Sequence, residues 1–373
     1  MRQTFERSQK SKRQHIFINK IPVFMKKADY IIVGGGFAGI FFAHQLLKHH
    51  KSFILFHNNR ASGSHISAGV CNPVILKRFS AFWKSSEQLE YLVKFFSEIE
   101  KYLGKNYLIN EPVARIFHDE EEKKQWCKNS QKADLKAYLN NDFIRLKTVE
   151  NPFGAGIVRR SCRINVKAFF ADFFHYLDTG GYLFEEDFEY DKINAEKSCY
   201  KDFEFKNIVF CEGVFLKHNP FFNDIPMQPN KGHCFEVEVN DSVEPYIIKK
   251  KHFLFSLDEN LYYYGGTYDR FDLTNEINEK SVLELDSGLK EFYKNSFKIK
   301  KINTAFRATV ADRKPILGRH PHYSNFYIFN GLGARGVLNG SYFSRKIFNF
   351  IENNIRLDSE VDVGRFYKSL QQS

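Results

Sequence analysis

A glycine-rich turn near the N-terminus constrains the fold of this chain more than any other feature. It follows a short apolar run at residues 30–33, which predicts a buried strand, and it precedes an apolar helical pattern. Its glycines have the spacing G-x-G-x-x-G and are Gly34, Gly36 and Gly39. In such a turn the first glycine permits the bend, the second lets a pyrophosphate approach the backbone, and the third lets the helix pack close to the strand. The N–H groups at the helix start, at Phe37 and Ala38, would then face the anion.

The residues after the turn complete a strand–helix–strand unit. The helical pattern covers residues 40–47, and a second apolar run follows at residues 53–56, so that the whole unit fits into about 30 residues. This context favours a dinucleotide site over an incidental turn. The acidic residue that usually holds the adenosine ribose is missing at the end of the second strand, where the chain reads His57-Asn58-Asn59. Because the side chains of His57 and Asn58 carry donors and acceptors, either one can still bind a ribose hydroxyl.

The composition describes a globular chain of roughly two domains. It has 373 residues, of which 43% are hydrophobic, enough to bury a substantial core. Its six cysteines include no C-x-x-C pair and no nearby histidine at metal-ligand spacing, which argues against a metal site and against a disulfide framework. We therefore expect no metal and a reducing, cytoplasmic location. No apolar run approaches the ~18 residues of a membrane-spanning helix, so no membrane span is predicted.

The first residues differ from the rest of the chain in charge. The net charge of the chain is +11, and residues 1–27 contain eight Lys or Arg against one acidic residue. We interpret residues 1–25 as a basic N-terminal extension outside the fold. A nucleic-acid-binding arm, a transit-like sequence and upstream sequence ahead of a start at Met25 are the alternatives for this segment.

The second half of the chain adds a β-rich region and a second glycine turn. Alternating apolar residues at 234–239, 251–257 and 261–267 predict strands of an antiparallel sheet. Near the C-terminus, the stretch GLGARG at residues 331–336 lies between a predicted strand at 326–329 and a closing helix. A helix start is thus placed for a second time where it can meet a ligand.

These segments together resemble the amino-acid-oxidase-like family of flavoproteins, which contains D-amino acid oxidase, glycine oxidase and sarcosine oxidase. The resemblance runs over nearly all of residues 26–370 and rests on six motifs in the family's order: YIIVGGGFAG, SAGVCNP, KNIVFCEG, YYYGGTYD, FRATVADRKPILG and FNGLGARGVLNGSYF. It implies bound FAD, with its pyrophosphate at the first glycine turn, the small-residue loop beside the flavin and the late glycine turn at the flavin's polar edge. The positions that inherit cofactor contacts are Gly34, Gly36, Phe37, Ala38, Gly39, His57, Asn58, Ala68, Gly69, Gly333, Arg335, Gly336 and Val337.

The resemblance also implies a substrate site. Arg307 stands where glycine-oxidase-like members keep the arginine that binds the substrate carboxylate, and a guanidinium suits this role because it donates two parallel hydrogen bonds. The alternative is a structural arginine paired with an internal carboxylate such as Asp312. Tyr268 is the candidate aromatic residue at the substrate. Tyr262 and Tyr264 are further candidates, and we expect at least two of the three tyrosines to be core residues.

We therefore expect an α/β fold with two parts. A Rossmann-like FAD-binding domain, assembled from discontinuous segments, would combine residues 26–80, 150–230 and 302–373. A β-rich substrate domain, an antiparallel sheet with helices, would combine residues 81–149 and 231–301. The ligand would lie between them.

The expected function is FAD-dependent oxidation of the C–N bond of a small amino acid, or of a secondary amine carrying a carboxylate, by hydride transfer to flavin N5. The electron acceptor would be O2 or a different molecule. Ala305 lies near the position of the cysteine to which sarcosine oxidases attach flavin, so the FAD is expected to be non-covalent. The alternatives are an FAD oxidase that removes a carboxymethyl group from the wobble uridine of tRNA, and a flavin-binding protein without catalysis. The oligomeric state is not predicted.

Overall fold

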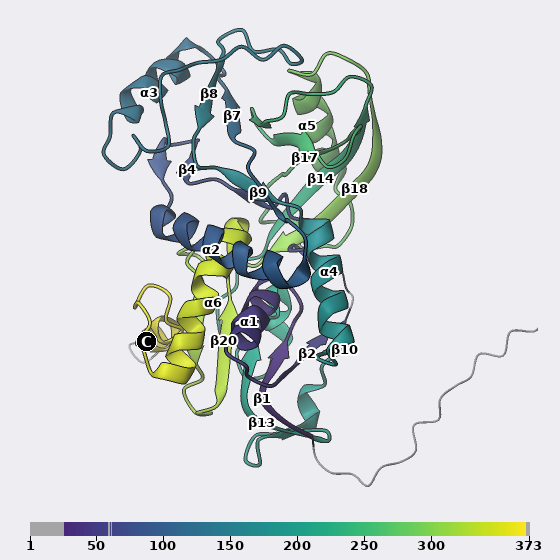
Figure 1. The fold of residues 1–373 in the computed structure, drawn as a ribbon, viewed down its shortest axis with the longest axis vertical. Helices are drawn as coiled ribbons and strands as arrows, with labels where there is room; N and C mark the ends of the chain where they lie inside the picture. The colour runs from purple at the N-terminus through teal and green to yellow at the C-terminus, as the bar shows by residue number, and fades with distance from the viewer. Residues whose placement is uncertain (1–25, 59, 61, 371–373) are drawn as a thin grey trace, which may run out of the picture.

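Two large β-sheets, one above the other along the long axis of the molecule, organise the structure (Figure 1). This computed structural model describes residues 26–58, 60 and 62–370. The predicted extension at residues 1–25 lies outside the described residues. The eight-stranded sheet forms the lower part of Figure 1 and the seven-stranded sheet the upper part.

The eight-stranded sheet is mainly parallel, as the glycine motif requires. Its strands in the order β10-β2-β1-β13-β20 are parallel, and β19 continues the sheet antiparallel beside β20, while β12 and β11 form an antiparallel extension beside β13. Parallel strands are covered on both faces, which explains why β2 reads as an unbroken buried run. The strands are β1 (Lys26–Val33), β2 (Phe53–His57), β10 (Leu183–Glu185), β11 (Ile193–Asn194), β12 (Cys199–Tyr200), β13 (Phe203–Phe210), β19 (Ile316–Arg319) and β20 (Phe326–Asn330).

Four helices cover one face of this sheet: α1 (Phe37–Lys48), α2 (Ser85–Leu103), α4 (Val166–Thr179) and α6 (Gly336–Asn353). The opposite face packs against a second apolar cluster that includes the 3-10 helix η2 (Gly213–His218) and the C-terminal helix α7 (Gly364–Leu370). Helix α1 lies between the sheet and the other helices. Ten of its twelve residues are therefore buried, which accounts for its apolar sequence on nearly every side.

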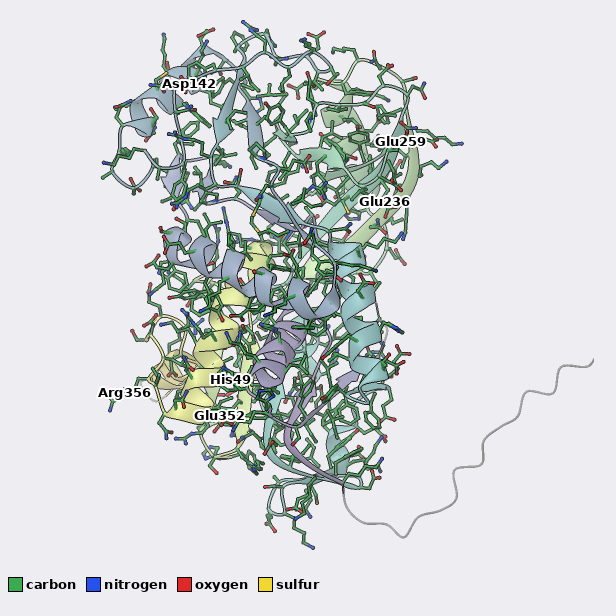
Figure 2. All side chains as sticks on the ribbon, viewed as in Figure 1. His49, Asp142, Glu236, Glu259, Glu352 and Arg356 are labelled. Carbon is green, nitrogen blue, oxygen red and sulfur yellow. The ribbon has the colours of Figure 1, made fainter. Side chains whose placement is uncertain are left out.

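Helices α1 and α6 lie side by side and end at the same end of the molecule (Figure 2). There the imidazole of His49 stacks on Phe348 with 4.3 Å between ring centroids. The carboxylate of Glu352 accepts a hydrogen bond from the Tyr30 hydroxyl and forms an ion pair with Lys51. This contact ties the two helices to β1 and leaves both helix starts at the opposite end, where the glycine turns lie.

The seven-stranded sheet has the order β18-β14-β17-β16-β15-β7-β8 and is mainly antiparallel. Side chains alternate between its two faces, so that one face packs under α5 (Glu279–Lys290) and the other turns toward the eight-stranded sheet. The strands are β7 (Val113–Ile116), β8 (Ala155–Val158), β14 (Asn230–Val239), β15 (Ile247–Lys249), β16 (Phe253–Ser256), β17 (Leu261–Gly265) and β18 (Phe297–Arg307). The smaller elements are β3 (Val70–Cys71), β4 (Val74–Ile75), β5 (Ser80–Ala81), β6 (Leu108–Ile109), β9 (Cys162–Ile164), α3 (Glu120–Ser130), η1 (Tyr190–Lys192) and η3 (Gly333–Arg335).

The sheets do not end at the boundaries expected from the sequence. Helix α2 belongs to the segment 81–149, yet it packs on α6, and β8 belongs to the segment 150–230, yet it pairs with β7 in the seven-stranded sheet. Strand β18 runs through residue 302 without a break. An apolar stripe specifies that a face is buried but not which sheet buries it, so the pattern could not place these elements.

Candidate cofactor and substrate site

The first glycine turn connects β1 to α1 as the motif predicts. Gly34 has φ +108°, and a Cβ atom there would lie 2.5 Å from the carbonyl oxygen of Cys211. A Cβ atom at Gly39 would overlap the carbonyl oxygen of Gly34, so the helix can approach the strand only with glycine at both positions. Gly36 is the N-cap of α1, and the first turn of the helix contains no acidic residue. The partial positive charge at the start of α1 is therefore not neutralised by a side chain of the first turn and can attract an anion.

The small-residue loop after β2 lies between the two sheets. The hydroxyl oxygen of Ser64 accepts a hydrogen bond from the Phe37 N–H at 3.1 Å, which fixes the loop to the start of α1. On the other side, the Cys234 thiol of β14 lies 3.9 Å from the carbonyl oxygen of Ile66. Gly69 has φ +65°, a left-handed conformation that glycine adopts without strain. The loop is thus held from both sides by the residues that flank it.

The late glycine turn at residues 331–336 also lies between the two sheets, next to the first glycine turn. The N–H of Gly333 donates to the carbonyl oxygen of Ala308 at 2.9 Å, which ties η3 to the residue after β18. A Cβ atom at Gly336 would lie 3.0 Å from the ring of Phe37, so α1 and α6 begin side by side. The Arg335 guanidinium stacks 4.2 Å from the ring centroid of Phe82, and burial lowers its pKa. Two helix starts and one guanidinium therefore face the same space.

This space is a cleft of about 2680 Å³ between the two sheets. Both predicted catalytic residues, Arg307 and Tyr268, line it. So does every predicted cofactor residue except Gly39, which lies behind the turn. The structure thus brings the residues of six separate motifs together around one cavity.

The end of β2 lacks the acidic residue of the usual ribose site, and other side chains meet there. His57 is buried and stacks on Phe174 with 4.7 Å between ring centroids. The Asn58 side chain donates to the carboxylate of Asp187 at 2.8 Å, and Arg60 binds the same carboxylate at 2.8 Å. Because β10 runs parallel to β2, Asp187 leaves the sheet at the same edge as Asn58. Sequence reasoning missed Asp187 because the neighbour of β2 is set by tertiary pairing.

A buried carboxyl group lies next to the first turn and was also missed. Glu212 follows β13, lines the cleft and sits against Gly34. It accepts hydrogen bonds from the Tyr190 hydroxyl and, at 2.6 Å, from the Asn219 amide. Burial raises the pKa of Glu212 to about 7, although both hydrogen bonds act to lower it. This group titrates near neutral pH beside the predicted pyrophosphate position.

Arg307 is the last residue of β18 and is held rigidly at the cleft wall. Its Nη1 donates to Asn230 Oδ1 and to the Thr267 carbonyl oxygen, both at 3.0 Å. Gly232 leaves room for the guanidinium, because a Cβ there would lie 2.6 Å from Nη1. Nη2 has no hydrogen-bond partner among the described residues. The alternative in which Arg307 pairs with Asp312 is wrong.

Asp312 has a different partner. Its carboxylate accepts from Arg365 Nε at 2.9 Å, at the far side of the turn that follows β18. A five-residue separation from Arg307 suggested a pair in the sequence. The chain reverses after Val310, and α7 supplies the cation instead.

The tyrosines on and after β17 divide between the core and the cleft, because side chains alternate between the two faces of a strand. Tyr262 and Tyr264 are buried in the apolar cluster under α5, in agreement with the expectation that at least two of the three are core residues. Tyr268 is 68% exposed, and the Arg307 guanidinium lies 4.1 Å from its ring centroid. Tyr263, between the two core tyrosines, points to the opposite face and lines the cleft, and burial raises its pKa so that it stays protonated. Period-two alternation was the signal that could have found Tyr263.

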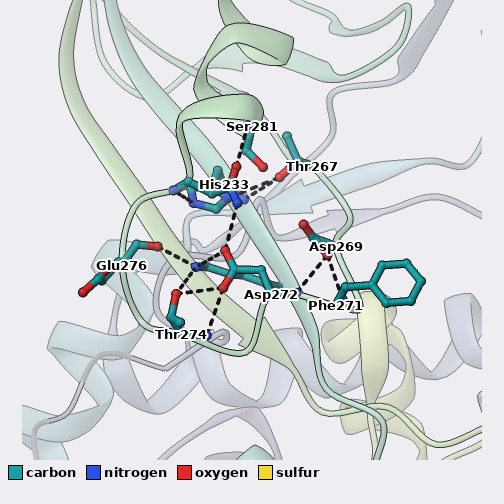
Figure 3. Close-up of polar contacts among 10 residues, drawn as sticks. His233, Thr267, Asp269, Phe271, Asp272, Thr274, Glu276 and Ser281 are labelled. Atoms are coloured by element: carbon teal, nitrogen blue, oxygen red, sulfur yellow. Dashed lines mark hydrogen bonds and ion pairs between the residues drawn. The ribbon is translucent and has the colours of Figure 1, made fainter.

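A network of hydrogen bonds and an ion pair holds the loop that follows Tyr268 in the sequence (Figure 3). The buried ammonium of Lys231 binds Asp272 at 2.8 Å and Thr274 Oγ1 at 3.2 Å. Hydrogen bonds to the Asp272 carboxylate, from Lys231 first and then from Thr274 and Asn278, lower its pKa. The N–H of Asn278 donates to His233 Nε2 at 3.0 Å, which fixes the other end of the loop. The backbone that presents Tyr268 is therefore set by β14 rather than by local turn chemistry.

Comparison with known proteins identifies the family. The sequence model of a family described as FAD dependent oxidoreductase (DAO) matches residues 29–347. The chain belongs to this family. It is an FAD-dependent oxidoreductase, and the resemblance noted in the sequence and the α/β fold class are both confirmed.

Solved structures share the fold at low identity. The glycine oxidase from Geobacillus kaustophilus superposes with TM-score 0.72 at 15% identity, over 91% of this chain and 98% of its own. The iminodiacetate oxidase from Chelativorans sp. BNC1 gives TM-score 0.72 at 14% identity, over 89% and 98%. The FAD-bound L-α-glycerophosphate oxidase from Mycoplasma pneumoniae gives 0.67 at 14%, over 89% and 96%.

The residues of the cleft fit FAD. Both helices that begin there, α1 and α6, lack acidic residues in their first turns, and the glycines leave the backbone open to a pyrophosphate. Within residues 26–370, apart from the two positions left out, no three His, Cys, Asp or Glu side chains are grouped so that they could hold a metal ion. None of the helices in this part of the chain is long and apolar enough to cross a membrane.

Proposed function

We propose that this protein oxidises the C–N bond of an amino acid or amine that carries a carboxylate. The observation that carries the proposal is Arg307, a guanidinium fixed through Nη1 on the cleft wall with Nη2 unpaired among the described residues. A guanidinium presented in this way binds a carboxylate through charge-assisted hydrogen bonds and orients the rest of the molecule. Similarity in fold to a glycine oxidase and an iminodiacetate oxidase supports the same class of substrate.

FAD would be held by the two helix starts and the loop between the sheets. The N–H group of Ala38 would bind the pyrophosphate, and that of Phe37 would join it by exchanging its hydrogen bond to Ser64 for one to the phosphate. Ala68 and Gly69 would lie beside the flavin, and Gly333 to Val337 would contact its polar edge. Bound FAD supplies the hydride acceptor, and the chain supplies position and charge.

We propose that the cofactor is bound non-covalently. Ala305 lines the cleft without a thiol. Cys234 also lines it, but burial raises the pKa of this thiol to about 11, so that it remains protonated and a poor nucleophile. Acid precipitation should release the yellow colour to the supernatant, and colour in the pellet would disprove this part of the proposal.

The ribose contact would come from Asn58 and Asp187 together. The carboxylate of Asp187 lies where β2 normally provides an acid, and Asn58 and Arg60 fix its orientation. A carboxylate accepts two ribose hydroxyl groups more readily than an amide does. We propose that β10 has taken over this role from β2.

Arg307 and its neighbours would position the substrate. Tyr268 stacks on the guanidinium and limits its movement, and the protonated Tyr263 offers a hydroxyl group on the same wall. No side-chain base would be required if the amine binds in its neutral form and bound FAD accepts the hydride. The wall therefore acts by orientation and charge.

The test is anaerobic reduction of the purified yellow protein. Glycine, sarcosine and iminodiacetate should bleach the flavin absorbance, whereas methylamine and dimethylamine, which lack the carboxylate, should do so far more slowly. L-α-glycerophosphate and carboxymethylated tRNA serve as substrates from other classes. Bleaching by one of these alone would overturn the proposal, and flavin that no substrate reduces would indicate a non-catalytic flavin protein.

A further inference from the structure

Three consecutive lysines mark the wall of the cleft formed by β15 and the residues after it. Lys250 forms an ion pair with Glu291 at 2.7 Å, and Lys251 forms one with Glu284 at 3.0 Å. Lys249 has no carboxylate within ion-pair distance among the described residues. Its ammonium donates to the carbonyl oxygen of Lys251 at 2.6 Å and lies 4.2 Å from the ring centroid of Phe253.

The surroundings of Lys249 add positive charge. Arg115 lies directly beside it on the adjacent strand β7, and its guanidinium already binds Glu122 at 2.9 Å. Lys77 and Arg78 line the same cleft from the loop after β4 and form no ion pair among the described residues. An uncompensated ammonium in a crowded cleft is unfavourable, because burial penalises its charge and the neighbouring cation repels it.

The titration of Lys249 agrees with this geometry. Burial lowers the pKa of Lys249 to about 7, and the charge of Arg115 lowers it in the same direction. The other titratable groups around this wall are His118, His252, Glu122 and Glu284, and the carboxylates are taken by Arg115, Lys251 and His252. An anion bound at Lys249 would supply the missing negative charge and raise its pKa again.

We propose that Lys249 binds a second anionic group of the substrate, a carboxylate or a phosphate, at the end of the cleft opposite Arg307. This inference rests on the proposed function, in which Arg307 binds the first carboxylate. Both residues lie on the sheet face that lines the cleft.

The separation of the two cations sets the length of the substrate. The order β18-β14-β17-β16-β15 places four strand spacings between their strands, or about 19 Å between the strand axes. The long side chains of Arg307 and Lys249 shorten the distance between their charged groups, but these groups remain apart. The substrate is therefore an extended amino acid with an anionic far end, longer than glycine.

The direct test measures anion binding to the FAD-loaded protein by calorimetry at pH 6.5, where Lys249 is mostly protonated. Inorganic phosphate and succinate are the two probes, and they distinguish a phosphate site from a carboxylate site. Lys249→Met should weaken binding of the preferred probe about tenfold or more, the value of a charge-assisted hydrogen bond. Lys250→Met and Lys251→Met are matched controls, because their ammonium groups already have carboxylate partners, and they should bind as the unaltered protein does.

A substrate comparison provides the second measurement. The selectivity for 2-aminosuberate over 2-aminooctanoate, which lacks the far carboxylate, should fall in Lys249→Met and be partly restored in Lys249→Arg. Equal probe binding by Lys249→Met and the unaltered protein would overturn the inference, as would equal losses in all three lysine variants. If no amine reduces the flavin but probe binding still depends on Lys249, the proposed function fails and the anion site stands.

Discussion

The two halves of the cleft are built in different ways. The cofactor half consists mainly of backbone: two glycine turns, two helix starts and a loop made mostly of small residues. The substrate half consists of side chains on the seven-stranded sheet, where Arg307, Tyr263 and Lys249 come from three different strands. Each part of the cofactor half is a short contiguous segment that can be recognised from its spacing, whereas a wall made from five strands has no spacing to recognise.

This contrast predicts that the cofactor half tolerates substitution least. Gly39→Ala should cost ~3 kcal/mol or more and abolish flavin binding, because the new Cβ would overlap the Gly34 carbonyl oxygen. Thermal unfolding and the flavin absorbance of the purified protein provide the measurement. Gly104→Ala is the control: Gly104 has a positive φ, unlike Gly39, but no atom lies within 4 Å of a Cβ built there, so the cost should be only the ~1 kcal/mol of the left-handed conformation. Similar losses in the two variants would show that close packing is not what the first turn requires.

The buried carboxyl group of Glu212 gives the cofactor half a pH dependence. Because its pKa rises from 4.5 to about 7 on folding, the unfolded chain loses this proton first, and stability should decline between these pH values and stay level above them. Glu212→Gln should remove this decline and stabilise the protein above pH 7 by roughly 3 kcal/mol. Chemical denaturation of both proteins at pH 4.5, 6 and 8 measures the difference. Curves that run parallel across this range would mean that Glu212 is ionised in the folded protein.

The substrate half should lose activity rather than cofactor. Arg307→Lys keeps the charge but not the planar fork, so kcat/KM for the carboxylated substrate should fall about 10- to 100-fold, or about 1.4–2.8 kcal/mol, at unchanged flavin content. Steady-state rates and the flavin-to-protein ratio provide the two readouts. Asp312→Asn is the control, because it breaks the contact with Arg365 and leaves Arg307 untouched. An equal loss on the decarboxylated amine would remove Arg307 from the substrate site.

The smallest effect is expected at Asp187, the carboxylate that we propose as the ribose contact. Here the cofactor half, like the substrate half, depends on side chains. Asp187→Asn should weaken FAD binding by the apoprotein about tenfold or less, since the carboxylate is partly exposed and shares its charge with Arg60. A fluorescence titration with FAD measures this change, and FMN, which lacks the adenosine ribose, should bind the variant and the unaltered protein equally. Asp191→Asn removes a neighbouring acid outside the cleft and should change neither. A loss for FMN as great as that for FAD would place Asp187 away from the ribose.

The sequence by itself determined the parts of this protein in which function lies within a short segment. The strand, turn and helix at residues 26–48, the late turn at 331–336 and the alternating strands of the second sheet all follow from local spacing. The helical pattern of charged residues continues to about residue 139, but helix α3 does not. It ends at Ser130, where the side chains of Asn129 and Ser130 bond back to the carbonyl oxygens of Gln125 and Cys127 and compete with the next helical turn.

Only the tertiary structure decided which distant residues meet. Pairing of β10 with β2 brought Asp187 beside Asn58, and reversal of the chain after β18 gave Asp312 the partner Arg365. Strand order set Lys249 and Arg307 four strand spacings apart on the same wall of the cleft. The physical reason is the same in each case. Local spacing records which face of an element is buried, and the partner that buries it is chosen by packing of the whole chain.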